Sequence, residues 1–431
     1  MRFNKNQIIL MIPIMYVLQS FFLGEEAFTT LLLVILAWYL VERRGCIAVP
    51  RIPGIKLYIV LLAFISLVGF IKFTPYLVIR DIYYEFNNLV AIYIGYIICF
   101  KHEDDDAFFK TIFGSIGMVS IIAVVLGVVS LASGASFFVL RQSFSVGIKS
   151  IEVFLPIFCV YFFMFNKVCF SKRIDRLILI CMIVQAFANL SRTTIAGVFI
   201  GLFVITMALQ MKGIKNLKSI AVILGGILVI VVGSSVLIKV LPDTIASTYL
   251  TKVFNTLNEI DAKLTFNSLA DANSNWRGYE IYCAQTQWIN CSIIEKIIGS
   301  GNGRMIELFY VPDQWQAIMV TQYGKQGVPM LHNSYYTLLI KGGVLLVVVF
   351  IAMLYRNVKK GYRAIRKYNS SSINIMALTL MSLSCVMFFD AYIIRGLVES
   401  DVQLLWAVSF GWLNCRLTNS DMINIESSNK T

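Results

Sequence analysis

The stretch HNSYYTLLIKGGVLLVVVFIAMLY at residues 332–355 joins a histidine and a short polar segment to a long apolar run. As a helix, residues 334–355 are long enough to cross the ~30 Å hydrocarbon core of a bilayer. The whole chain has 431 residues, of which 58% are hydrophobic, more than a soluble domain can bury. The sequence therefore predicts an all-α protein that crosses a membrane several times.

Apolar runs of similar length recur along the chain and predict about twelve transmembrane helices. Residues 177–211 fit either two helices that meet at Ser191-Arg192 or one long helix with a charge inside it. We interpret the first run as a retained anchor, because no small-residue cleavage site follows it. The predicted spans are 7–23, 26–42, 56–72, 84–100, 111–133, 150–166, 177–190, 193–211, 219–241, 334–355, 373–394 and 401–415.

The positive charges predict the orientation of these spans. The chain has 37 Lys and Arg and a formal net charge of +13, and most of the basic residues fall on alternate connections between spans. The positive-inside rule then places both termini in the cytoplasm. Because the charges are scattered over short connections, they favour this topology over nucleic-acid binding. The predicted organisation is nine helices in 1–241, a periplasmic loop at 242–333, three helices in 334–415 and a disordered cytoplasmic tail at 416–431.

The loop 242–333 is the one predicted extramembrane segment that is long enough to fold. Helical spacing of apolar residues predicts helices over 245–257 and 276–289. In the second helix, Trp276, Tyr279 and Cys283 share one side and Trp288 falls on the other. The glycines in 299–303 then break the chain.

His332 is one of only two histidines and lies where the loop meets the predicted tenth span. Histidine exchanges a proton near neutral pH, which suits it to be a general base or a substrate-binding group. Asn333 and Ser334 are typical helix caps and would hold it at a fixed position. The alternative is an inert residue, hydrogen bonded at the start of a helix.

Several arginines are candidates for binding an anion. Arg192 lies between two apolar runs, where a charged side chain is costly and often functional, although it could instead extend to the lipid headgroups. Arg277 lies on the predicted loop helix, where an ordinary surface arginine is the alternative. Asp390 and Arg395 could simply pair with each other.

The motifs of several enzyme classes are missing from the sequence. It has no cluster of His, Cys and carboxylate residues with metal-ligand spacing, no phosphate-binding loop of the Walker type and no nucleophilic-serine motif. An enzyme on the outer face has no ATP available. We therefore expect no metal and no cofactor, and a substrate that arrives already activated.

Four motifs occur in an order that resembles the superfamily of O-antigen ligases and Wzy-type surface-polysaccharide polymerases. They cover about residues 185–355. They are Leu190-Ser191-Arg192, Trp276-Arg277 with Trp288 downstream, the segment from Ile298 to Gly303, and His332-Asn333-Ser334-Tyr335 followed by Leu338 to Gly343.

This resemblance implies a fold like that of the GT-C glycosyltransferases and a metal-independent, inverting glycosyl transfer at the periplasmic face of the bacterial inner membrane. The donor would be a glycan on undecaprenyl diphosphate, and a polysaccharide chain-length regulator would be a partner. Arg192 and Arg277 would hold the diphosphate, and His332 would take the proton from the attacking hydroxyl. Further candidates for substrate contact are Arg80, Arg141, Arg304, Asn333 and Tyr335.

The reaction itself stays open between three alternatives. We favour a polymerase, which transfers the glycan to another lipid-linked repeat unit. A ligase would use the same donor but transfer the glycan to lipid A-core. A flippase or other transporter for lipid-linked oligosaccharides would also have about twelve spans, but it would be expected to have two similar halves and charges distributed inside its spans.

Overall fold

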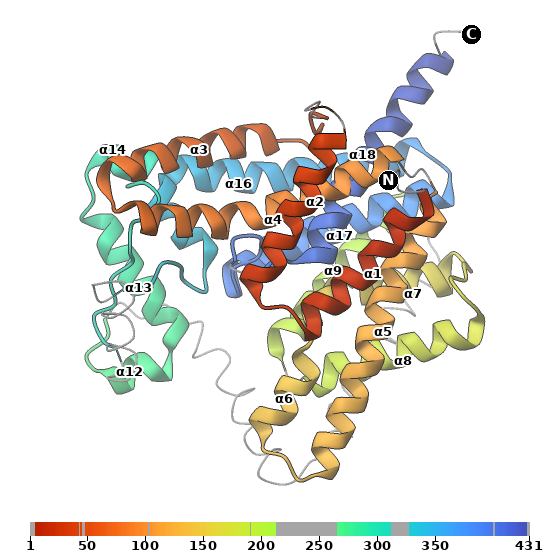
Figure 1. The fold of residues 1–431 in the computed structure, drawn as a ribbon, viewed down its shortest axis with the longest axis horizontal. Coiled ribbons are helices and arrows are strands. Elements are labelled where there is room, and N and C mark those ends of the chain that lie inside the picture. Colours follow the sequence, from red (N-terminus) through yellow and green to blue (C-terminus); the bar gives the residue numbers. More distant parts are fainter. Residues whose placement is uncertain are drawn as a thin grey trace.

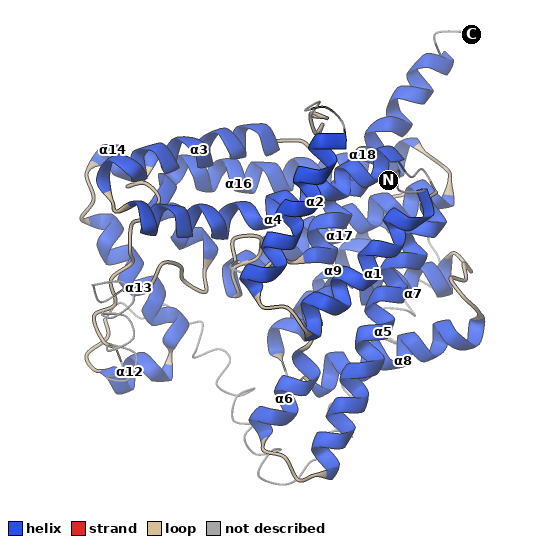
Figure 2. Cartoon of the chain, in the orientation of Figure 1, coloured by secondary structure: helices blue, strands red, loops and turns tan. Residues whose placement is uncertain are grey.

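The computed structural model describes residues 5–42, 44, 48–101, 104–189, 191–212, 265–311, 327–399 and 401–428. Within these ranges the regular elements are helices, as Figure 2 shows. One isolated antiparallel bridge joins Ile306 to Val328. The prediction of an all-α protein is confirmed for this part of the chain.

Five of the described helices are long and apolar enough to cross a membrane, and a bent pair raises the number to six. In this pair, α6 (Phe137–Ser145) is followed by α7 (Ile148–Cys159) and the π-helical turn η1 (Val160–Met164), and the bend is 55°. The five are α3 (Ile55–Lys72), α5 (Asp105–Ala132), α9 (Arg192–Met211), α16 (Ser334–Lys367) and α17 (Ser371–Ile393). The chain is thus a helical membrane protein by the length and composition of these helices.

Other predicted spans also coincide with helices. These are α1 (Lys5–Phe21), α2 (Glu25–Glu42), α4 (Pro75–Lys101), α8 (Lys172–Ala188) and α18 (Leu404–Ser428). The predicted span 219–241 and the predicted helix 245–257 lie outside the described residues.

Three details differ from the prediction or complete it. Residues 177–211 form two helices, because Ser191 caps the second one by accepting from the Thr194 amide. The connection before α7 contains the helix α6, which the sequence analysis missed. The tail predicted to be disordered from residue 416 continues α18 as far as Ser428, and Arg416 Nε binds Asp105 at 2.7 Å.

One end of the bundle collects the starts of α7, α16 and α18 and the ends of α1 and α17; we call it the His332 end. There the Ser334 hydroxyl donates to the Arg395 carbonyl, and Lys149 forms an ion pair with Glu399. These segments are far apart in the sequence. These segments meet because the helices that carry them run in opposite directions.

The opposite end collects other connections in the same way. Besides the Arg416–Asp105 pair, Lys212 Nζ donates to the Tyr368 carbonyl at 2.7 Å, which joins the end of α9 to the connection between α16 and α17. These contacts join segments that are far apart in the sequence.

Three short helices lie beyond the ends of α3 and α16, at the left of Figure 1: α12 (Leu269–Ser274), α13 (Trp276–Ile289) and α14 (Ile293–Ile298). The bounds of α13 are those predicted. A capping box between Ser292 and Glu295 starts α14. The Lys72 ammonium, at the end of α3, donates to Glu295 at 3.0 Å and keeps the pKa of that carboxyl below its usual value.

The glycine turn 299–303 is inserted into a break in α16. Gly343 has φ 64° and ψ −174°, so the regular hydrogen bonds of α16 are interrupted there. The amides of Ser300 and Gly301 donate instead to the carbonyls of Ile340 and Lys341, at 3.1 and 2.9 Å. A Cβ on Gly299 would lie 2.1 Å from the Lys341 oxygen, so only glycine fits this approach.

A buried ionic cluster joins the turn to the long helices. Lys341 Nζ lies 2.7 Å from Asp81 Oδ2, and both side chains are at most 1% exposed. The same carboxyl oxygen accepts from the Gly303 amide at 2.6 Å. Asn302 Nδ2 donates to Glu85 Oε2 at 2.7 Å. These contacts connect α16, α4 and the glycine turn in one buried network.

Replacing Lys341 by Met should destabilise the protein strongly, because it removes the closer of two cationic partners, Lys341 and Arg80, from the buried Asp81 carboxylate. Breaking a buried pair in this way typically costs about 3–5 kcal/mol. The matched control is Lys72→Met, which removes a pair whose side chains are 41% and 30% exposed and should cost less than about 1 kcal/mol. Thermal unfolding of the purified protein in detergent measures both. If both variants lose the same free energy of unfolding, the buried pair contributes no more to stability than the exposed pair.

Candidate active site

Helix α13 lies beside the segment that leads to α16. Its residues Tyr279 and Cys283 are fully buried and pack with Phe266, whereas Trp288 packs on another cluster with Leu331. The two sides of α13 are therefore those predicted. The bridge between Ile306 and Val328 fixes the chain just before His332.

His332 is held by Glu280, a residue that the sequence analysis did not single out. His332 Nδ1 lies 3.0 Å from both carboxyl oxygens of Glu280, and the His332 amide donates to Glu280 Oε2 at 3.0 Å. Trp276 Nε1 donates to Glu280 Oε1, also at 3.0 Å. The Glu280 side chain is 5% exposed and that of His332 is 39% exposed. The buried carboxylate thus fixes the ring while part of the imidazole faces outward.

A small pocket contains this pair and Arg277. The first turns of α13 form one wall, His332 and Asn333 form another, and the end of α17 closes it with Tyr392 and Ile393. Asn333 is 3% exposed, and its Nδ2 has no hydrogen-bond partner among the described residues. A buried donor without a partner costs about 1–3 kcal/mol unless something binds it. The pocket is therefore lined by residues that carry an imidazole, a guanidinium and an amide.

Asn333 also begins α16. Its Oδ1 accepts from the amides of Tyr335 and Tyr336, at 3.0 and 3.4 Å, as the sequence analysis expects of a cap. Arg395 Nε donates to the Leu331 carbonyl at 3.2 Å, so the connection after α17 holds the other side of the segment. The backbone is consequently held on both sides of His332, by Arg395 at Leu331 and by the cap at Asn333.

Arg192 lies at a different place at the same end of the bundle. It is half-buried at the start of α9, which packs on α7 and α17. Two residues on, Thr194 Oγ1 donates to the buried Glu152 of α7 at 3.0 Å. Arg192 does not line the pocket of His332, although α17 contributes to both places.

The other predicted substrate-binding residues have separate positions. Arg80 is 9% exposed and lies in the buried ionic cluster, where its Nη2 approaches Asp81 Oδ1 at 3.4 Å. Arg304 lines a polar hollow beside α14 together with Glu295. Arg141 is exposed on α6, and the Tyr335 hydroxyl donates to the Phe388 carbonyl at 2.8 Å. Of the predicted site residues, the structure brings Arg277 and Asn333 to His332.

Asp390 and Arg395 make contacts other than the pair that the sequence analysis considered. Asp390 Oδ2 lies 3.6 Å from Lys149 Nζ, while Arg395 Nε binds the Leu331 carbonyl. Arg395 has φ 83°, a left-handed conformation that is rare for a side chain of its size. This turn of the backbone directs the connection after α17 toward the segment before α16.

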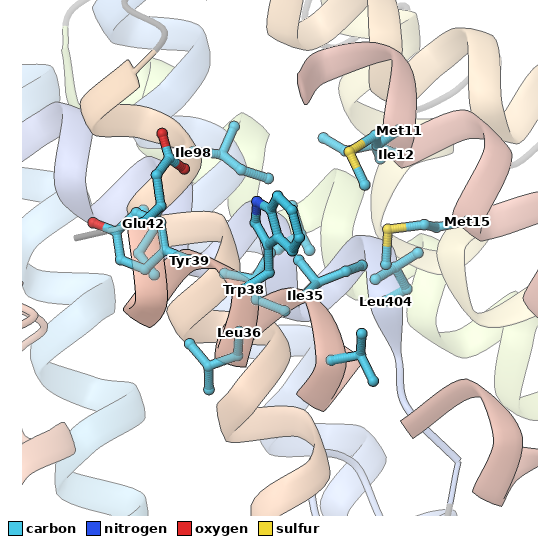
Figure 3. A pocket seen from close by; sticks show the side chains of 14 residues that line it. Met11, Ile12, Met15, Ile35, Leu36, Trp38, Tyr39, Glu42, Ile98 and Leu404 are labelled. Carbon is cyan, nitrogen blue, oxygen red and sulfur yellow. The ribbon is translucent and has the colours of Figure 1, made fainter. Parts of the chain in front are cut away.

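A second hollow is apolar. It lies between α1, α2, α4 and α18, and Figure 3 shows Trp38 across its middle, with Met11, Met15 and Leu404 around it. Glu42 and Tyr39 lie near one another at its margin in the same view. This largely apolar lining suits hydrocarbon chains.

In the described part of the chain, no group of three or more His, Cys, Asp or Glu side chains is arranged to hold a metal ion. No protein-family model matches the chain, and neither does any curated protein. The residues of the His332 pocket therefore carry the functional assignment.

Two substitutions of Asn333 separate its two roles. Asn333→Ala should lower the free energy of unfolding by about 1 kcal/mol, because the cap of α16 is lost. Asn333→Ser keeps a neutral oxygen acceptor for the two amides and should lower the free energy of unfolding much less, but it removes the buried Nδ2 donor. Thermal unfolding in detergent tests this difference. If Ser destabilises as much as Ala, the cap is not the structural role of this residue.

Proposed function

We propose that this chain is a membrane glycosyltransferase of the surface-polysaccharide polymerase type. It would transfer a glycan from undecaprenyl diphosphate to a lipid-linked repeat unit at the periplasmic face of the bacterial inner membrane. The observation that carries the proposal is the buried Glu280 carboxylate on Nδ1 of a partly exposed His332, in a pocket that Arg277 also lines. The twelve-span topology, the GT-C-like fold and the sidedness belong to the same proposal.

The first chemical task is the removal of a proton from the acceptor hydroxyl. Glu280 lies on Nδ1, so the neutral ring donates its N–H to the carboxylate and keeps a lone pair on Nε2. Nε2 then takes the hydroxyl proton as the oxygen attacks the anomeric carbon. The Glu280 charge stabilises the imidazolium that forms. This is the arrangement of a general base that is oriented by a buried carboxylate.

The second task is the stabilisation of the leaving group. The bond from the anomeric carbon to the diphosphate oxygen breaks, and the oxygen keeps the electron pair. Arg277 would bind the diphosphate oxygens, and Asn333 Nδ2 would donate to the same group. Arg192 would contact the diphosphate or the lipid from the other side of the α17 end. A lipid diphosphate is already a good leaving group, which agrees with an enzyme that uses no ATP.

A polymerase and a ligase share this donor chemistry and differ in the acceptor. Purified protein supplied with lipid-linked repeat units separates the classes, because a polymerase lengthens the glycan and a transporter does not. Added lipid A-core as the acceptor identifies a ligase. We favour the polymerase on the resemblance described above.

Replacing His332 by Ala should lower the rate of chain extension by about 10²–10⁴, since the base is lost. Glu280→Gln should lower kcat by at least about tenfold with a much smaller change in KM, because the amide can present its N–H to Nδ1 and reverse the tautomer. Extension of lipid-linked repeat units by purified variants, at equal protein level and thermal stability, measures both. If His332→Ala makes polymer of normal length at the normal rate, His332 is not the base.

Arg277→Ala and Asn333→Asp should raise the KM for the diphosphate donor, because each removes a donor from the pocket. Loss of one charge-assisted hydrogen bond typically costs about 1.5–3 kcal/mol, which corresponds to roughly 10- to 100-fold in binding. Arg173→Ala is the matched control, because Arg173 is exposed near the start of α8 and does not line the pocket. Donor saturation curves give the comparison. Curves that coincide for all three variants would remove the assigned role of Arg277 and Asn333.

A further inference from the structure

Helix α14 and the end of α13 carry an exposed apolar surface, which we call the isoleucine patch. Its four residues are between 53% and 76% exposed: Ile289, Ile293, Ile294 and Ile297. Positions 293, 294 and 297 fall on one side of α14. Single exposed apolar residues are normal on a protein surface, whereas several together mark a contact with a partner or a membrane. Such a group is unexpected in a segment that the sequence analysis places in an aqueous loop.

The patch adjoins the apolar outer surface of α16. The end of α14 touches the break in α16, where a Cβ on Gly343 would lie 2.3 Å from the Ile297 oxygen. Directly after this break, α16 exposes Val344, Leu345 and Val348, in a helix whose length and composition fit a bilayer span. Gly343 is about 14 Å along the axis from the start of the helix at Ser334, at 1.5 Å per residue. The end of α14 therefore lies beside the apolar stretch of α16.

A second span, α3, ends beside α14, as Figure 1 shows. The Lys72 ammonium, on the last residue of α3, lies 3.0 Å from Glu295 Oε1 of α14. The two residues before it, Phe70 and Ile71, are exposed. Because α3 is just long enough to cross the hydrocarbon core, its last turn would lie near the boundary between the acyl chains and the headgroups. The ion pair thus holds α14 at the level of this boundary.

The polar side chains beside the patch are of the kinds that gather at a membrane surface. The Lys296 ammonium lies 5.8 Å from the centre of the Trp288 ring. Tryptophan is enriched at the level of the headgroups, and lysine reaches from that level into water. The one acidic residue of α14, Glu295, is paired with Lys72, so this carboxylate does not approach lipid without a cation.

We infer that α14 is an interfacial helix, whose isoleucine patch is inserted among the acyl chains of the membrane lipids. A bilayer is the partner that this patch fits, because the surfaces of α3 and α16 next to it belong to helices that fit a bilayer span. The inference depends on these two spans and does not depend on the proposed glycosyl transfer. Helix α14 would then anchor the short helices to the membrane surface.

The test measures which solvent surrounds α14 in the full-length protein, reconstituted in phosphatidylcholine nanodiscs. A nitroxide is attached to Ile294→Cys in a Cys291→Ser background, and the background protein treated alike gives the signal of the other native thiols. Val348→Cys, on the exposed apolar side of α16, is the reference for lipid. Asn273→Cys, exposed on the polar helix α12, is the matched control for water. Electron paramagnetic resonance gives the collision rates of each nitroxide with oxygen and with the water-soluble nickel complex of ethylenediaminediacetate.

We expect the ratio of oxygen to nickel collisions at Ile294→Cys to exceed that at Asn273→Cys by at least about tenfold, because hydrocarbon excludes the polar complex and dissolves oxygen. The ratio should approach that at Val348→Cys. A ratio below this margin shows that α14 faces water. Low collision rates with both reagents show that protein covers the patch, such as a second copy of the chain. Either of these results overturns the inference, and neither bears on the role proposed for His332.

Discussion

The position of the short helices α12–α14 depends on a lysine and an aspartate that are almost completely buried. Taking both charges out of water is costly, and their attraction offsets this only because the geometry is close and the carboxylate has a second donor in the Gly303 amide. Lys341 lies in α16, Asp81 in α4 and Gly303 in the glycine turn. The pair therefore joins two long helices and the loop at one point, and that point cannot shift without leaving a charge unpaired.

The break in α16 connects this constraint to the site. The helix begins at Ser334, two residues after His332, and is interrupted at Gly343, where the glycine turn supplies the missing hydrogen bonds. The first part of α16 is thus held at its start by the Asn333 cap and at its end by the turn. His332 and α13 approach each other from two segments that are both fixed to this short piece of helix. These supports hold His332 against the Glu280 carboxylate.

Much of the fold could be predicted because its signals are local. The apolar runs and the spacing of Trp276, Tyr279 and Cys283 lie within single helices, so the sequence carries them directly. At the start of the tail, Arg416 binds Asp105 and Thr418 accepts from Lys360, and such contacts with other helices have no local signal in the sequence. The same limit applies to the site. His332 and Arg277 stand out by type and motif, whereas Glu280 is an ordinary surface-type residue until folding buries it against His332. The one sequence signal for Glu280 is that it lies four residues after Trp276. Arg80 and Arg304 resemble Arg277 in sequence, and only the tertiary structure separates them.

The glycine turn is attached largely through backbone groups, with close approaches that leave no room for a side chain at Gly299 or Gly69. An attachment of this kind makes few demands on the side chains elsewhere in the short helices α12–α14. Those helices can change their surface residues while their anchor on the membrane bundle stays the same. Substitutions around the pocket of His332 can then change what the pocket binds, while the long helices stay as they are.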